Sequence, residues 1–323
     1  MNMKIKNKAA AIILSGITLT GCGSATIPTI SNVQEIEETN IVEEPEIEEI
    51  EKVEVVDANN TLYNIDIINV VKADVNTPIM SSIFNDGKLL GTFAAGREFA
   101  LVSDEDPDWY VIKYYDAYGY VKKEDTHIEF EKVVTEPVID KGYLPNGGII
   151  YETEELDNEK TSLEVLEFVE IHADYGDSYL VSTLNYDIGF VKKEDITLLE
   201  GNLALVDISD QHVVYYRDNE RVFASPCVSG TINTGRATNL GLQEIISKWG
   251  AGMIAPGAWV ECVAYFNSDY EGFHTADYWR NSYEYGGDTY TYNGSHGCIN
   301  MPNEKGLELC GMLEVGDKTL IKM

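Results

Sequence analysis

The stretch SHGCINM at residues 295–301 determines which chemistry we predict for the C-terminal part of the chain. Gly297 lets the backbone turn tightly, so that amides beside Cys298 can converge on one point, as a site for a developing oxyanion requires. His274 lies upstream of Cys298 in the chain. An upstream histidine can deprotonate the thiol, and the resulting thiolate–imidazolium pair is a competent acyl-transfer nucleophile near neutral pH. The sequence therefore predicts a Cys–His dyad.

The residues around this stretch predict a domain built mostly of strands. Short runs in which β-forming residues dominate and turn residues follow are typical of strands; these runs are LALVDIS (203–209), VVYY (213–216) and WVECVAYF (259–266). A helix is expected from Asn303 as N-cap after Pro302, with an apolar face made of Leu307, Cys310 and Leu313.

His274, a long loop and the SHGCIN sequence together resemble the L,D-transpeptidase catalytic domain, also called the YkuD domain, over residues 201–323. The resemblance implies that Cys298 is the nucleophile and His274 the general base, held by the backbone carbonyl of Thr275 rather than by a carboxylate. His296, Gly297 and Cys298 would form the oxyanion-binding turn, with Ser295 and Asn300 in supporting positions.

The chain departs from the family pattern at three points. Residues 237–241 read ATNLG where the family usually has Thr-Pro-Thr-Gly. Asn300 replaces a common arginine, which we expect to alter contacts with a substrate carboxylate. The spacing between His274 and Cys298 is long, which predicts a larger lid over the donor site.

The same resemblance implies a peptidoglycan stem peptide as substrate. Cys298 would attack the carbonyl of its third residue, a diamino acid, and release D-Ala. The acyl group would then pass to the side-chain amine of another stem, giving a 3→3 cross-link. With water as acceptor the enzyme would be an L,D-carboxypeptidase. A thiolate and backbone amides suffice for this chemistry, so neither a metal nor an organic cofactor is expected.

Other protein classes that use cysteine fit the order of residues in this chain less well. Papain-type and NlpC/P60 peptidases place a histidine after the cysteine, and sortases place an arginine there, but neither residue type follows Cys298. A zinc site made of His274, His296, Cys298 and Cys310 would lack the short paired spacings of structural zinc motifs. The rival from another class is a non-catalytic, wall-binding lipoprotein whose transpeptidase domain has decayed.

Two related segments precede this domain. YGYVKKED at 118–125 recurs as IGFVKKED at 188–195, an offset of 70 residues. Each copy consists of short β-type runs broken by Gly, Asn and Asp, and resembles a bacterial SH3-like domain. We therefore predict a mainly β protein: two small SH3-like β-barrels, at 60–130 and 131–200, followed by a mixed, mostly β L,D-transpeptidase domain. Residues that would stack on wall sugars or peptides are Trp109, Tyr114, Tyr115 and Tyr118.

The N-terminal residues have the features of a secretory signal peptide. Lysines at positions 4, 6 and 8 precede an apolar run at 9–19 that is too short to cross a bilayer. The following LTGC resembles a bacterial lipoprotein cleavage box, which implies that residues 1–21 are removed and that Cys22 is lipidated. Two or more acyl chains anchor a protein stably, so we expect a membrane-anchored protein on the cell-wall side. Residues 22–59 are expected to form an acidic, disordered linker.

The net charge limits which partners are expected, and the cysteine content limits which disulfides are possible. The net charge of −32 argues against nucleic acid as a partner, because such binding requires Lys and Arg to displace counterions from phosphate. A monomer is expected. The thiol of Cys298 is expected to be free, whereas Cys227, Cys262 and Cys310 are either core thiols or include one disulfide, since pairing depends on geometry.

Overall fold

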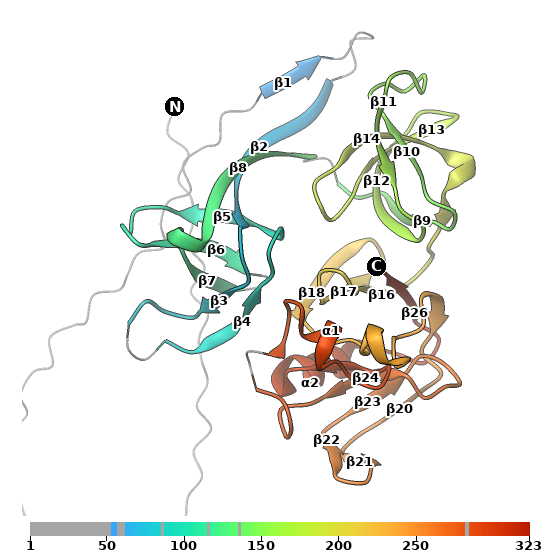
Figure 1. The fold of residues 1–323 in the computed structure, drawn as a ribbon. Coiled ribbons are helices and arrows are strands. Elements are labelled where there is room, and N and C mark those ends of the chain that lie inside the picture. Colours follow the sequence, from blue (N-terminus) through green and yellow to red (C-terminus); the bar gives the residue numbers. More distant parts are fainter. Residues whose placement is uncertain (1–52, 57–61, 85–86, 115–116, 135–136, 282–283) are drawn as a thin grey trace, which may run out of the picture. The chain divides into compact units, whose positions relative to one another are not determined.

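The computed structural model describes residues 53–56, 62–84, 87–114, 117–134, 137–281 and 284–323 (Figure 1). These residues form a mainly β protein, as predicted. The predicted signal segment, Cys22 and most of the predicted linker lie outside the described residues. Within the described ranges, no helix combines the length and the apolar character that a membrane crossing needs.

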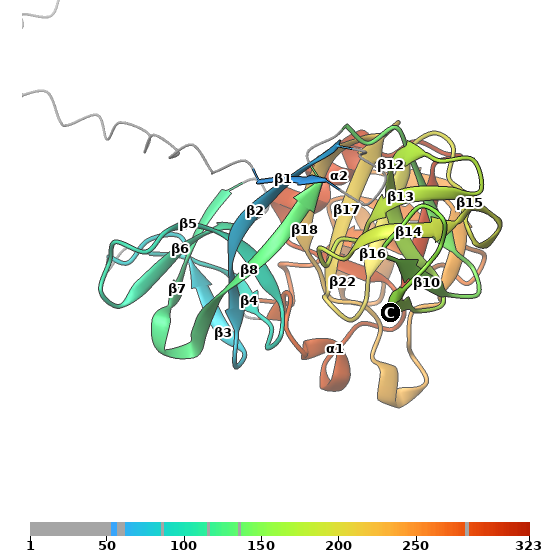
Figure 2. The same ribbon diagram turned by 90° about the horizontal axis from the view of Figure 1, so that it is seen from above.

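The first sheet has eight strands in the described part of the chain, in the order β1-β2-β5-β6-β7-β3-β4, with β8 paired to β2. Figures 1 and 2 both show the long β2 and β8 running side by side. Its strands are β1 (Val53–Val56), β2 (Leu62–Ala73), β3 (Thr77–Met80), β4 (Leu89–Phe93), β5 (Glu98–Ser103), β6 (Trp109–Tyr114), β7 (Ala117–Lys122) and β8 (Thr126–Val134). β1 falls inside the predicted disordered linker, and its pairing with β2 corrects that boundary.

The second sheet has seven strands in the order β11-β10-β14-β13-β12-β9-β15. They are β9 (Asp140–Leu144), β10 (Gly148–Tyr151), β11 (Glu159–Leu163), β12 (Glu167–Asp174), β13 (Ser178–Ser182), β14 (Ile188–Lys192) and β15 (Thr197–Leu198). Among the described residues neither this sheet nor the first closes into a barrel. The SH3-like barrels are therefore not confirmed and stay a prediction.

The sequence repeat folds the same way in both copies. The β6–β7 hairpin pairs Trp109 with Lys122, and the β13–β14 hairpin pairs Ser178 with Lys192. Each hairpin ends in a short 3-10 helix of sequence Lys-Glu-Asp, η1 (Lys123–Asp125) and η2 (Lys193–Asp195). The repeated sequence thus specifies a repeated hairpin, whatever the closure of the sheets.

The residues predicted to bind the wall do not share one environment. Tyr114 is only 6% exposed and packs edge-on against Phe99 in the core of the first sheet, so the prediction of a surface role for it is wrong. It alternates along β6 with exposed Lys113, and a strand directs such neighbours to opposite faces. Tyr118 is 54% exposed, Trp109 is half-buried, and Tyr115 lies outside the described residues.

The C-terminal residues form two further sheets and a separate hairpin. The third sheet runs β18-β17-β16-β26-β19 and the fourth β20-β23-β24-β25. The strands are β16 (Leu203–Asp207), β17 (His212–Arg217), β18 (Glu220–Pro226), β19 (Gly241–Glu244), β20 (Ser247–Trp249), β21 (Gly252–Ala255), β22 (Ala258–Val260), β23 (Val263–Tyr265), β24 (Gly272–Thr275), β25 (Ile299–Met301) and β26 (Lys318–Lys322). β21 and β22 pair only with each other among the described strands.

The helices of this region are short: η3 (Ile232–Thr234), α1 (Thr289–Tyr292) and α2 (Asn303–Met312). One apolar core joins the third sheet, the fourth sheet and α2. Helix α2 begins at Asn303, but Pro302 and not the predicted Asn303 is the N-cap residue. Leu307 is 45% exposed, so the predicted apolar face is partly wrong. The buried residues of α2 are Gly306, Leu309 and Cys310. The residues of the predicted apolar face are spaced by three, and because one helical turn takes 3.6 residues, such positions move progressively around the helix.

Candidate active site

The parallel pair β24–β25 brings the two predicted catalytic segments together. Its register places Phe273 beside Ile299 and His274 beside Asn300. Phe273 and Ile299 belong to the apolar core, and successive side chains of a strand point to opposite faces. His274 and Asn300 therefore lie on the face away from that core. Cys298 directly precedes β25, one residue before the strand begins.

The imidazole of His274 is held in its neutral form. Its imidazole is 3% exposed, and Nδ1 lies 3.0 Å from the carbonyl oxygen of Thr275. Because a carbonyl only accepts, Nδ1 carries the hydrogen and Nε2 keeps its lone pair. Burial lowers the pKa of His274 to about 4, with the Arg280 guanidinium acting in the same direction. The contact with Thr275 is the one that the family resemblance implies.

The thiol of Cys298 is also neutral at rest. Burial raises its pKa to about 11, and the nearby Glu271 carboxylate raises it further, while a hydrogen bond from the Gly272 backbone acts in the opposite sense. Sγ lies 3.5 Å from the carbonyl oxygen of Tyr270. Burial therefore disfavours both ions of the predicted thiolate–imidazolium pair.

Ser295 shapes the turn before Cys298. Its Oγ accepts a hydrogen bond from the Gly297 amide at 3.0 Å and donates one to the carbonyl oxygen of Cys298. Gly297 has φ of 121°, and a Cβ there would lie 2.6 Å from Oε1 of Glu271. Only glycine fits this turn. The Gly297 amide is used by Ser295, so of the predicted oxyanion-binding residues only His296 and Cys298 could offer a backbone amide that this bond does not occupy. The side chain of His296 is exposed.

Two residues beside this turn were not predicted: Thr238 is hydrogen-bonded to it, and the Glu271 carboxylate lies close to Gly297. Thr238 Oγ1 donates to the Gly297 carbonyl at 2.8 Å and accepts from the Gly230 amide at 2.9 Å. Glu271 accepts hydrogen bonds from the Asn239 amide at 3.1 Å and from Asn267 Nδ2 at 2.7 Å. Thr238 lies in the ATNLG segment, which departs from the family pattern. That departure is the feature of the sequence that could have drawn attention to Thr238.

Asn300 is tied into the sheet through its backbone, which exchanges two hydrogen bonds of 2.9 Å with Val228. Its side chain is buried beside His274, and its Oδ1 has no hydrogen-bond partner among the described residues. The expected contact between Asn300 and a substrate carboxylate remains a prediction.

The segment between the two predicted catalytic residues is held together by hydrogen bonds between its own residues. Arg280 Nη1 donates to the Asn293 carbonyl at 2.8 Å, and buried Tyr285 donates its hydroxyl to Asp277 at 2.7 Å. Large side chains on exposed positions near this region are Trp249, Tyr270, Trp279 and Tyr292. The ring of Trp279 lies 5.8 Å from that of His274. The predicted lid is not tested by these contacts.

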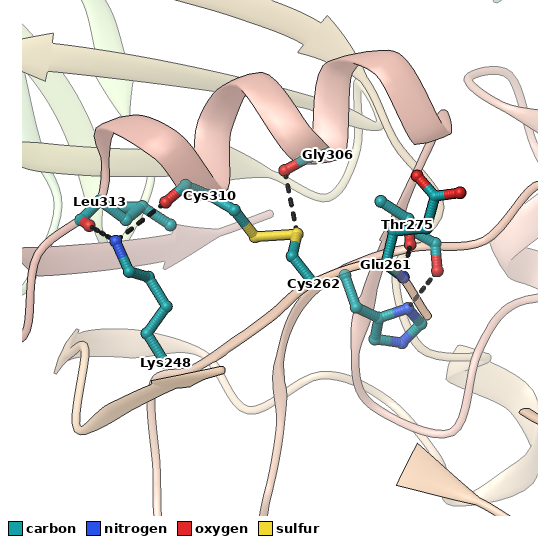
Figure 3. The surroundings of a disulfide bond; sticks show 8 residues. Lys248, Glu261, Cys262, Thr275, Gly306, Cys310 and Leu313 are labelled. Carbon is teal, nitrogen blue, oxygen red and sulfur yellow. Dashed lines mark hydrogen bonds between the residues drawn. A yellow bond between two sulfur atoms is a disulfide. The ribbon is translucent and has the colours of Figure 1, made fainter. Parts of the chain in front are cut away.

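The cysteines divide into one pair and two free thiols within the described residues. Cys262 and Cys310 form a disulfide, whereas Cys227 is buried and free, and Cys298 is half-buried and free. Figure 3 shows the disulfide between the segment before β23 and helix α2. Cys310 is therefore unavailable as a metal ligand. Across the described part of the chain, no three His, Cys, Asp or Glu side chains gather as a metal site.

The C-terminal region of the chain matches a known protein family. Residues 201–321 match the family model of the YkuD L,D-transpeptidase catalytic domain. A comparison with curated proteins gave no match.

Solved structures similar to this chain include three structures of two L,D-transpeptidases. The Stackebrandtia nassauensis enzyme is 27% identical over 38% of this chain and 55% of its own, with a TM-score of 0.32, so this chain spans about half of that relative. A mutant of the Enterococcus faecium enzyme is 22% identical over 56% of this chain and 75% of its own, with a TM-score of 0.36. The E. faecium catalytic domain acylated by ertapenem is 32% identical over 38% of this chain and 98% of its own, with a TM-score of 0.32.

Proposed function

The chain belongs to the L,D-transpeptidase catalytic domain family through residues 201–321, and from this premise we propose that it is a cysteine acyltransferase that forms 3→3 cross-links between peptidoglycan stem peptides. Cys298 is the nucleophile and His274 the general base. The observation that supports this most is the β24–β25 register, which sets a buried imidazole with its Nε2 lone pair available beside the strand that Cys298 directly precedes.

The first half-reaction makes a thioester. His274 Nε2 takes the proton of Cys298 as Sγ bonds to the carbonyl carbon of the third stem residue, so that charge separates only as the new bond forms. The carbonyl oxygen becomes an oxyanion facing backbone amides of the turn that Ser295 and Thr238 hold. The protonated imidazole then gives its proton to the nitrogen of the terminal D-Ala as the C–N bond breaks. D-Ala leaves, and the stem remains on Sγ.

The second half-reaction restores the enzyme. A side-chain amine of another stem attacks the thioester carbon, and His274 accepts a proton from that nitrogen. The C–S bond breaks, the proton returns to sulfur, and a 3→3 linked dimer leaves. With water as the attacking group the same steps give a shortened stem, which is the L,D-carboxypeptidase alternative. No metal or organic cofactor enters either sequence.

We propose that the protein works at the cell wall while anchored to the membrane through a lipidated Cys22. The acidic segment that follows Cys22 would give the folded part reach away from the bilayer, which suits a body too acidic to be drawn to anionic wall polymers by charge. Of the residues proposed to touch the wall, Tyr118 and Trp109 keep exposed ring area.

Incubation of the detergent-solubilised full chain with tetrapeptide muropeptides tests the proposal. Chromatography of the products should show free D-Ala and 3→3 dimers for the wild type and for Cys227→Ala, a control that removes the other free thiol. Cys298→Ala should give neither product. D-Ala with tripeptides and no dimers would assign the carboxypeptidase. Retention on sacculi without D-Ala release would assign a non-catalytic wall-binding protein.

A further inference from the structure

We propose that the Cys262–Cys310 disulfide is a positioning element for His274, so that reducing it slows the chemical step of the reaction. This inference rests on the proposed function, in which His274 is the general base. Three successive contacts connect the sulfur atoms to the imidazole, and each is a hydrogen bond or a close packing contact between described residues.

The first connection joins two segments that are distant in the sequence. The disulfide ties Cys262, in the turn between β22 and β23, to Cys310 near the end of α2 (Figure 3). Cys262 Sγ also lies 3.2 Å from the carbonyl oxygen of Gly306. Lys248 Nζ donates to the carbonyl oxygens of Cys310 and Leu313 at 3.0 and 2.6 Å, which satisfies the end of the helix. The disulfide is thus the covalent link between the turn and the helix.

The second connection places Thr275 between these two segments. The amide of Glu261, next to Cys262, donates to Thr275 Oγ1 at 2.8 Å. On the helix side, a Cβ at Gly306 would lie 2.8 Å from Thr275 Cγ2, so the helix backbone packs closely against this side chain. Thr275 is completely buried. Figure 3 shows Thr275 with Glu261 on one side of the disulfide. The turn and the helix therefore both hold the side chain of Thr275, in addition to the pairing of its backbone with Met301 in the sheet.

The third connection runs from Thr275 to the base. Its carbonyl oxygen accepts the Nδ1 hydrogen of His274 at 3.0 Å. That bond fixes the tautomer with Nε2 unprotonated and sets the direction of the ring. A displacement of about 1 Å in such a group can cost roughly 100-fold in rate. Separating the turn from the helix would release Thr275 and, with it, the orientation of the imidazole.

Reduction is a defined chemical change. A trialkylphosphine converts the S–S bond to two thiols and takes an oxygen atom from water to become the phosphine oxide. Cys227 and Cys298 are already free thiols, so the reagent changes only the Cys262–Cys310 pair among the cysteines of the described residues. The matched variant is the double substitution Cys262→Ala with Cys310→Ala, and Cys227→Ala is the control.

The experiment compares oxidised and phosphine-treated full-length protein. We expect kcat for D-Ala release to fall roughly 10- to 100-fold on reduction, with KM unchanged within about 2-fold, because binding does not require an oriented base. The double variant should match the reduced wild type and should not respond to phosphine. Thr275→Val, which loses the hydroxyl, should be slow in either state, and Thr275→Ser should retain most of the rate.

A second readout does not depend on turnover. The 15N chemical shifts of the His274 ring should report the Nδ1–H tautomer in the oxidised protein and a tautomer mixture after reduction. Unchanged kcat and unchanged ring shifts after reduction would overturn the positioning role. Loss of near-ultraviolet circular dichroism in parallel with the rate would also overturn it, because the disulfide would then hold the whole domain together. If the oxidised protein shows the fixed tautomer but no D-Ala release, the proposed function fails and the positioning of the ring stands.

Discussion

The alkylation rate of Cys298 as a function of pH tests the protonation states that the structure assigns. Thiolate is the form that reacts with iodoacetamide, so the rate follows the thiolate fraction. A thiolate–imidazolium enzyme reacts at a constant rate from acid to neutral pH. A neutral thiol instead gains about tenfold in rate for each pH unit until its pKa is reached.

The expected size follows from the burial of the two side chains. With a pKa of about 11, roughly one Cys298 thiol in 10⁴ is ionised at pH 7, compared with roughly one in 10² for a thiol with the ordinary value of 9.0. His274, with a pKa of about 4, provides no positive charge at neutral pH to stabilise the thiolate. We therefore expect alkylation roughly 100-fold slower than for an unperturbed cysteine.

The cause can be tested separately. Glu271→Gln removes the charge that raises the pKa of Cys298, so this variant should react faster at pH 7. Asp269→Asn is the matched control, because Asp269 contacts the Asn239 side chain and is not among the groups that shift the thiol pKa. Mass spectrometry of the peptide containing Cys298, at intervals from pH 5 to pH 10, gives the rates.

A plateau in the alkylation rate between pH 5 and pH 8 would refute the reasoning. It would show that an ion pair exists at rest and that burial does not control either pKa. Equal acceleration by Glu271→Gln and Asp269→Asn would refute the assignment to Glu271 and would point to a general effect of surface charge.

Three further outcomes are expected. Ser295→Ala removes both hydrogen bonds of the turn and should lower kcat/KM roughly 10- to 100-fold, measured by D-Ala release, because these two bonds together stabilise the turn by about 1–3 kcal/mol. Reducing the Cys262–Cys310 disulfide, which closes a separation of 48 residues, should lower the free energy of unfolding by about 2–4 kcal/mol in urea titrations. His274 is protonated only below about pH 4 when folded but below about 6.5 when unfolded, so stability should fall by about 3 kcal/mol from pH 7 to pH 4, and His274→Asn should lose that much less over the same range.

Local features of the fold and of the candidate active site could be predicted from the sequence because they depend on residues that are neighbours in the chain. The glycine at 297 is required by a turn with positive φ, and the start of helix α2 follows from Pro302 and Asn303. The repeated hairpins likewise follow from repeated residues. Such features need only short-range backbone geometry.

The remaining features depend on segments that meet only in the folded chain. Thr238 reaches Gly297 across 59 residues, and no local pattern marks a hydroxyl for that contact. The Glu271 carboxylate, which comes from another loop, lies close to Gly297 of the same turn. The Cys262–Cys310 pairing and the burial of Tyr114 also depend on tertiary packing. The effect of burial on the pKa values of Cys298 and His274 could not be predicted, because a motif does not reveal how deeply its groups are buried.

The most direct test of the account is to trap the acyl-enzyme. The full chain is mixed with a tetrapeptide stem in the absence of an acceptor, quenched in acid within seconds, and mapped by mass spectrometry. The account predicts that the peptide containing Cys298 gains the mass of the stem without its terminal D-Ala, and that His274→Ala accumulates this adduct much more slowly. Release of D-Ala while Cys298 stays unmodified, with activity retained in Cys298→Ala, would contradict it.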